Sequence, residues 1–183
     1  MPNCIVAKIS PGRARHILNS PPGLLKKKKN IEKIEMFYLP SYIVDVQVRT
    51  KKVVRIQSLC IDAVLGSFAF FQLSESVPSP PPKFATCPFV LSETDIHSKA
   101  IDEYRRHLLH IGLKMRYQFQ IEKIVSCHPI YYPFWIGYFH RKGSIDFDVI
   151  DAVGGEHQGA AMRPVFMQAL LHEQHRAGKN GPA

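Results

Sequence analysis

The stretch IDAVLG at residues 61–66 recurs almost unchanged as IDAVGG at residues 150–155. Ahead of each copy, a tyrosine, a proline, an aromatic residue and an isoleucine recur with the same spacing, as YLPSYI at 38–43 and YYPFWI at 131–136. Recurrence of several motifs in the same order is the signature of a structural unit used twice. We therefore predict two tandem copies of one unit, related by pseudo-twofold symmetry.

Within each copy the hydrophobic period changes from helical to strand-like. Ser10 and Pro11 suit the start of a short helix, as N-cap and first-turn residue. In the second copy, apolar residues repeat at helical spacing over 96–115, and Thr94 or Asp95 can cap that helix. Segments in which apolar and polar residues alternate follow both helices, as in half-buried strands. The predicted fold class is α+β, two helix-plus-antiparallel-sheet repeats followed by a C-terminal helix.

These patterns divide the chain into four parts. Repeat 1 covers residues 1–73 and repeat 2 covers residues 93–160, each a helix with a β-meander. A proline-rich linker joins them at 74–92, and residues 161–183 form a last helix and a frayed tail. From the shared proline to the shared aspartate, copy 1 is four residues longer than copy 2. We expect this excess to lie in a longer hairpin loop at 49–53, because loop tips tolerate insertions.

Composition and charge restrict the classes of function. The 183 residues are 45% hydrophobic and 21% charged, which is typical of a globular protein. The formal net charge of +9 favours an acidic partner, an anionic membrane or nucleic acid. Nucleic-acid binding is therefore our alternative hypothesis, although solvated surface charge would explain the same residues. Its candidate contacts are Lys26, Lys27, Lys28, Lys29, Lys51, Lys52, Arg105 and Arg106.

The cysteines and the hydropathy pattern indicate a cytoplasmic protein. The four cysteines, Cys4, Cys60, Cys87 and Cys127, include no C-x-x-C pair, so we expect free thiols in a reducing compartment. The sequence shows neither a secretory signal nor an apolar run of the about 18 residues that a spanning helix needs. It leaves open whether the chain forms a homodimer.

The repeated aspartates and glycines are the first candidates for chemistry. Asp62 and Asp151 could form a pair of acid–base carboxylates. The alternative, which we favour, is that each aspartate binds backbone amides in a turn, with Gly66 and Gly155 at positions of positive φ. This interpretation predicts no catalytic residue in either copy.

Metal and nucleophile chemistry have weaker support in the sequence. His107 with His110, and His172 with His175, are spaced to share helix faces, and Cys127 or His128 could supply a third zinc ligand. The spacings match no established zinc motif, and no glycine-rich phosphate loop is present. We therefore expect exposed histidines, a Cys127 that packs as a small apolar group, and neither metal nor cofactor.

Aromatic residues gather in the second copy, where they form either the core or a binding surface. The candidates for partner binding are Tyr132, Phe134, Trp135, Tyr138 and Phe139. Strand aromatics beside lysine and arginine can stack on bases, but they also build cores and interfaces. Our leading hypothesis is a non-enzymatic binding or regulatory module for a protein or peptide, which would dock on this surface or on an exposed sheet edge.

The end of the second copy, FDVIDAVGGE at residues 147–156, resembles the closing strand of PepSY-type modules. The first copy, CIDAVLGS at 60–67, matches less well because it lacks the glutamate. The resemblance covers only the strand half of each repeat. It implies a small α+β binding or inhibitory domain, often in tandem and without catalytic residues of its own.

Overall fold

The computed structural model describes residues 2–20, 29–51, 53–70, 76–77, 87–115, 118–160 and 162–179. Its helices are α1 (Pro11–Asn19), α2 (Glu93–Met115) and α3 (Arg163–Lys179). Its strands are β1 (Asn3–Ile5), β2 (Lys33–Thr50), β3 (Val53–Asp62), β4 (Phe68–Phe70), β5 (Ser76–Val77), β6 (Phe119–Arg141) and β7 (Ser144–Asp151). The predicted α+β class and the C-terminal helix are confirmed.

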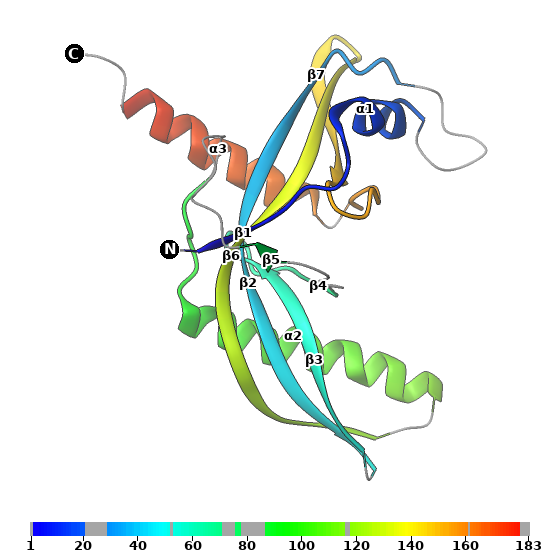
Figure 1. Ribbon diagram of the computed structural model, residues 1–183, viewed down its shortest axis with the longest axis vertical. Helices are drawn as coiled ribbons and strands as arrows, with labels where there is room; N and C mark the ends of the chain where they lie inside the picture. Colours follow the sequence, from blue (N-terminus) through cyan, green and yellow to red (C-terminus); the bar gives the residue numbers. More distant parts are fainter. Residues whose placement is uncertain are drawn as a thin grey trace.

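Two long antiparallel strands, β2 and β6, run through the length of the molecule (Figure 1). The strand order is β4-β3-β2-β6-β1-β5, and β7 also pairs with β6. The sheet is mixed because β1 lies parallel to β6, whereas its other pairings are antiparallel. Leu39 lies opposite Tyr132, and these residues occupy the same position in the two copies of the repeat. Contacts between the two copies therefore form the centre of the sheet.

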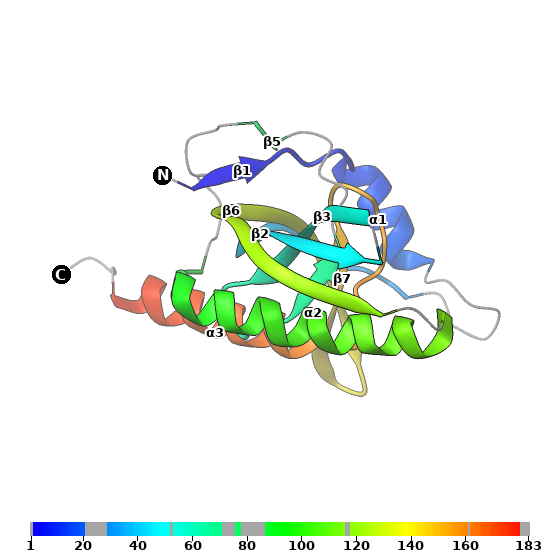
Figure 2. The same cartoon turned by 90° about the horizontal axis from the view of Figure 1, so that it is seen from below.

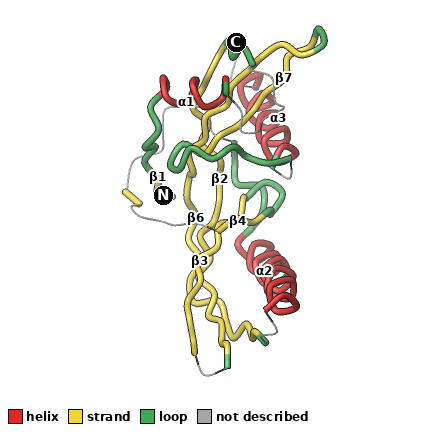
Figure 3. Tube along the Cα trace, turned by 90° about the vertical axis from the view of Figure 1, so that its right-hand side faces the viewer, coloured by secondary structure: helices red, strands yellow, loops and turns green. Residues whose placement is uncertain are grey.

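Each helix packs on the hairpin of the other copy. The apolar side of α2 packs on Tyr42, Val44, Val46 and Val48 of β2 and on the end of β3, from the first copy, and also on the start of β6 in its own copy. Helix α1 packs on Trp135, Phe139, Ile150 and Ala152 of the second copy. Figures 1 and 3 show α2 along one half of the long strands and α1 at the other. The two sequence repeats thus interlock and do not form separate globules.

Backbone hydrogen bonds fix this exchange at equivalent positions. The amide of Ala63 donates to the Pro40 carbonyl (2.8 Å), and the amide of Ala152 donates to the Pro133 carbonyl (3.1 Å). The segment before α2 is held by Leu91 N donating to the Ala63 carbonyl (2.8 Å). Ahead of α1, Ile9 N donates to the Ala152 carbonyl at the same distance. These matched contacts are consistent with the predicted pseudo-twofold relation.

Helix α3 covers the second face of the half that α1 also covers. Val165, Phe166 and Ala169 of α3 are buried against Phe37 and Phe134, which face away from α1. The Phe166 ring meets that of Phe134 edge to face, with a centroid separation of 4.9 Å. Figure 2 shows α1 and α3 on opposite sides of the sheet. Strands buried on both faces need no polar face, which explains the aromatic run in β6.

The extra residues of the first copy lengthen its strands and not its loop, so the expected longer loop at 49–53 was wrong. Thr50 pairs with Val53 and Arg141 pairs with Ser144, so two residues separate the paired ends in both hairpins. Counted from the shared proline to the turn, and from the turn to the shared aspartate, each strand of the first hairpin is instead two residues longer. Because side chains alternate between the two faces of a strand, an insertion of two residues leaves every side chain on its original face. An insertion of one residue would move the following side chains to the opposite face.

The start of α2 also differs from the expectation. Ser92 is the capping residue, in place of Thr94 or Asp95. Its hydroxyl accepts from the Asp95 amide (3.2 Å), and the Asp95 carboxylate accepts from the Ser92 amide (3.0 Å). This reciprocal pair is a capping box, with Asp in place of the usual Glu. In α1, the predicted cap Ser10 accepts from the Arg13 amide at 3.4 Å.

None of the helices in the described ranges is both long and apolar enough to cross a bilayer.

Candidate partner-binding groove

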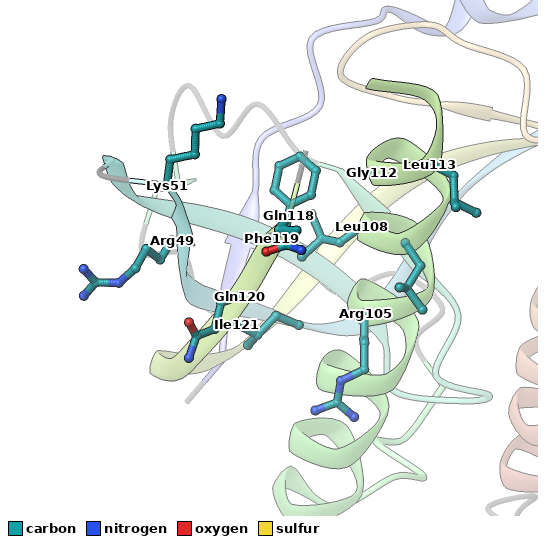
Figure 4. Close-up of a pocket in the computed structure, with 11 residues that line it drawn as sticks. Arg49, Lys51, Arg105, Leu108, Gly112, Leu113, Gln118, Phe119, Gln120 and Ile121 are labelled. Atoms are coloured by element: carbon teal, nitrogen blue, oxygen red, sulfur yellow. The ribbon is translucent and has the colours of Figure 1, made fainter. Parts of the chain in front are cut away.

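An open groove of about 890 Å³ lies between the second half of α2 and the adjacent ends of β2 and β6. The helix contributes residues 105–113, and the start of β6 contributes residues 118–121. Figure 4 shows Leu108 and Phe119 facing each other inside the groove, with Arg49, Lys51 and Arg105 toward its edge. Its size is in the range of clefts that hold a ligand or a few side chains of a partner.

The apolar lining arises from the spacing of residues on α2. Ile96, Ala100, Tyr104 and Leu108 follow one another at four-residue steps and are buried against the sheet. Leucines in the neighbouring row are not covered in this way: Leu109 is 64% exposed and Leu113 is 84% exposed, and both line the groove. Exposed leucines beside a hollow indicate a contact surface more strongly than scattered ones do.

The groove carries positive charge, and none of the described residues that line it has a carboxylate. Arg49 pairs with Glu122, outside the lining, and Arg105 lies 3.7 Å from the carboxylate of Asp102. Hydrogen bonds from Gln47, and then from Arg49, lower the pKa of Glu122, so this pair stays charged at neutral pH. Lys51 stands at the hairpin tip with φ of 51°. The groove therefore joins an apolar floor to a basic rim.

Of the residues predicted to contact nucleic acid, those that the structure describes do not form one surface. Lys29 binds Asp148 of β7, and its Nζ atom lies 4.5 Å from the Phe139 ring centroid. It therefore contacts the β6–β7 hairpin and does not line the groove. Arg106 makes a 2.9 Å ion pair with Glu103 on α2. Only Lys51 and Arg105 of the predicted set line the groove. The remaining members, Lys26, Lys27, Lys28 and Lys52, lie outside the described residues.

The aromatic residues proposed as a partner-binding surface belong to the core, so that assignment was wrong. Tyr132, Phe134, Trp135 and Phe139 are buried, and Tyr138 is partly buried. Both faces of β6 are covered here, by α1 on one side and α3 on the other, because alternate aromatics point to opposite faces. The Trp135 indole N–H donates to the Ile9 carbonyl at 2.8 Å, which satisfies its polar atom.

The repeated aspartates organise the turns that end the two hairpins. The buried Asp62 carboxylate accepts from the backbone amides of residues 64–67, at 2.6–3.3 Å. Asp151 accepts from the amides of Val153 and Gly154 and from the Tyr132 hydroxyl. Gly66 and Gly155 have φ of 81° and 87°. Asp62 lies opposite Ser41 of β2 and Asp151 lies opposite Phe134 of β6, so these contacts hold both carboxylates in turns near the middle of the long strands.

A sheet edge is also exposed beside the groove. Among the described residues, β4 pairs only with Leu59–Ile61 of β3, so residues 53–58 have a strand neighbour on the β2 side alone. Val54 and Ile56 are exposed there, and Arg55 lies between them. A charged residue within an edge strand is typical of edges that resist further pairing. The groove is therefore the better candidate for a partner.

One cluster of metal-ligand side chains was missed by the sequence interpretation. Glu93 and His97 of α2 meet Cys127 of β6, with ligand atoms within 4.8 Å of one another. Cys127 lies beside His97 and not beside the predicted partner His107, which stacks on Tyr104. An E-x-x-x-H spacing at a helix start was the available signal, but the placement of Cys127 beside it depends on the fold.

Comparison of the chain with protein-family models, with curated protein sequences and with solved structures gave no match, so the resemblance to PepSY modules stays a prediction.

Proposed function

We propose that this protein is a binding module that holds an acidic, amphipathic helical segment of a partner protein in the groove beside α2. The observation that carries the proposal is the combination of an apolar floor with a rim of cations and a lining that has no carboxylate. A helix laid in such a groove would place its apolar residues on Leu109 and Leu113 and its acidic residues near Arg49, Lys51 and Arg105.

Charge favours this occupant over a neutral or basic peptide. The whole chain has a net charge of +9, so acidic segments are attracted before contact is made. The leucines supply the apolar contact area that a purely electrostatic site lacks. Free nucleic acid would use the cations but would leave Leu109 and Leu113 without apolar partners, since backbone phosphates contact charged and polar groups.

The experiment uses the full chain, labelled with ¹⁵N, and a designed acidic amphipathic peptide of helical pattern. A scrambled peptide of the same composition is the control ligand. We expect chemical-shift changes centred on Leu109, Gly112, Leu113 and Phe119 with the patterned peptide, and much smaller changes with the scrambled one. Leu113→Asp should weaken binding at least about tenfold, because it places a charge in the apolar centre of the contact.

A matched variant distinguishes binding in the groove from non-specific binding to exposed apolar residues. Ile145 is 70% exposed on β7, outside the groove, so Ile145→Asp should leave affinity unchanged. Shift changes that fall elsewhere, or equal effects of Leu113→Asp and Ile145→Asp, would contradict the proposal. Tighter binding of single-stranded RNA, with affinity falling steeply as salt rises, would support the nucleic-acid alternative instead.

A further inference from the structure

A second site lies at the opposite end of α2 from the groove, where three side chains converge. Glu93 and His97 are four residues apart, so they share one face of the first two turns of the helix. Cys127 faces them from β6, and the three ligand atoms lie within 4.8 Å of one another. The helix and the strand that follows it therefore supply carboxylate, imidazole and thiol to one point.

The separations are close to those of a tetrahedral metal centre. With zinc bonds of about 2.1 Å to nitrogen and oxygen, tetrahedral geometry places these two ligands about 3.4 Å apart. The His97 Nε2 and Glu93 Oε1 atoms are 3.6 Å apart. A zinc–sulfur bond of about 2.3 Å would place the Cys127 sulfur about 3.6 Å from the other two ligand atoms, and it lies within 4.8 Å of them, so a side-chain shift of at most about 1 Å completes the set.

The imidazole gives independent evidence for a missing ligand. The His97 Nε2 atom is buried and has no hydrogen-bond partner within the part of the chain that the structure describes. Buried polar atoms without a partner are rare in folded proteins, because their desolvation is not compensated. It lies 3.6 Å from Glu93 Oε1 and within 4.8 Å of the Cys127 sulfur, so one cation could contact all three atoms.

The surroundings suit a borderline-soft divalent ion. Phe89, Leu91 and Cys127 pack against the core beneath α2, so one side of the cluster is apolar, while Glu93 faces solvent. A thiolate with an imidazole and a carboxylate is a donor set typical of zinc, whereas calcium and magnesium prefer oxygen alone. The exposed side leaves room for water or a partner's side chain as the fourth ligand.

We propose that Glu93, His97 and Cys127 form a zinc site that links the start of α2 to β6. The corresponding positions of the first helix are Pro11 and Arg15, which are not ligands, so the site belongs to the second copy alone. Burial, with the nearby Glu93 carboxylate, raises the pKa of the Cys127 thiol to about 11, so zinc must displace a proton from sulfur.

The test is a zinc titration of the full chain against a chromophoric chelator, repeated with cobalt(II) as a spectroscopic probe. We expect one ion per chain, a sulfur-to-cobalt charge-transfer band in the near ultraviolet, and a higher melting temperature with zinc. His97→Gln, Glu93→Gln and Cys127→Ser should each weaken binding at least about tenfold, since even residues that only orient a ligand have effects of this size. Cys127→Ser should also abolish the band.

Two matched variants control for other histidines and cysteines. His110 lies on the exposed side of the same helix, and Cys4 lies in β1, so neither belongs to the cluster. The variants His110→Gln and Cys4→Ser should therefore bind zinc like the wild type. Glu93 and His97 are at least partly exposed, so their variants should fold even if Cys127→Ser does not. No zinc binding by the wild type, or binding unchanged in His97→Gln and Glu93→Gln, would overturn the proposal.

Discussion

At the residue scale, Asp62 shows how one buried carboxylate can fix a turn. It is 3% exposed and accepts from four consecutive backbone amides. Buried amides that lose their acceptor cannot bind water instead. Removal of the carboxylate therefore leaves several amides unsatisfied and lowers the free energy of unfolding. Asp151, at the equivalent place, is less buried and accepts from two amides and from Tyr132.

Removal of the two carboxylates should therefore have unequal effects. We expect Asp62→Ala to lower the free energy of unfolding by about 2–3 kcal/mol and Asp151→Ala by about 1–2 kcal/mol. Urea unfolding followed by circular dichroism measures both. Asp62→Asn keeps one acceptor oxygen and should lie between wild type and Asp62→Ala. Equal losses at the two positions would show that the number of amides bound does not set the cost.

At the element scale, two contacts decide how the helices are placed, and the first is the capping box of α2. Ser92→Ala removes the hydroxyl that accepts from the Asp95 amide and should cost about 1 kcal/mol in thermal or urea unfolding. Thr94→Ala is the control, because Thr94 is exposed in the first turn of the helix. A larger loss in Thr94→Ala than in Ser92→Ala would refute Ser92 as the cap.

The second contact joins α3 to β7 through Arg163, which binds Asp146, donates to the Phe147 carbonyl (2.9 Å) and covers the Phe147 ring. Burial raises the pKa of Asp146, but hydrogen bonds from Arg163 and from the Phe147 amide outweigh it, and the net pKa is lowered. A lowered carboxyl pKa contributes stability above the unfolded value of about 3.9, and this contribution is lost as pH falls through the folded value.

The Asp146 contact should therefore give an acid-dependent stability. At pH 7 we expect Asp146→Asn to be about 1 kcal/mol less stable than wild type, since Arg163 is half exposed and its pair is partly screened. The difference should shrink as pH falls from about 5 to below 3, where the wild-type carboxyl is also neutral. Urea unfolding across this range measures it. A difference that stays constant with pH would mean that the carboxylate charge has no part in holding α3.

At the scale of the whole molecule, the exchange of helices makes the two sequence repeats dependent on each other. We expect fragments 1–80 and 81–183 to lack stable tertiary structure alone, because fragment 1–80 lacks α2 and fragment 81–183 lacks α1, the helices that pack on their hairpins from the other copy. Mixed together, they should associate and recover the dispersed amide spectrum of the intact chain. Two-dimensional NMR of each fragment and of the mixture tests this. A fragment that folds alone as a monomer would contradict the interlocked arrangement.

This exchange also marks the limit of what the sequence could predict. Alternation in β2 and helical spacing in α2 were enough to predict the elements, because these periods are local. Neither period says which half of a sheet a helix will cover, and that choice depends on contacts such as Leu91 to Ala63. For the same reason the groove and the cluster around Cys127 were not foreseen, whereas the aspartate turns lie within short local motifs.

The pairing of β2 with β6 also has a consequence during synthesis of the chain. Residues 33–50 leave the ribosome long before residues 119–141, with which they form the centre of the sheet. Until then, β2 has an unpaired edge and an uncovered apolar face, which are the features that make nascent chains aggregate. The nascent protein is therefore most in need of chaperones while its second half is being made.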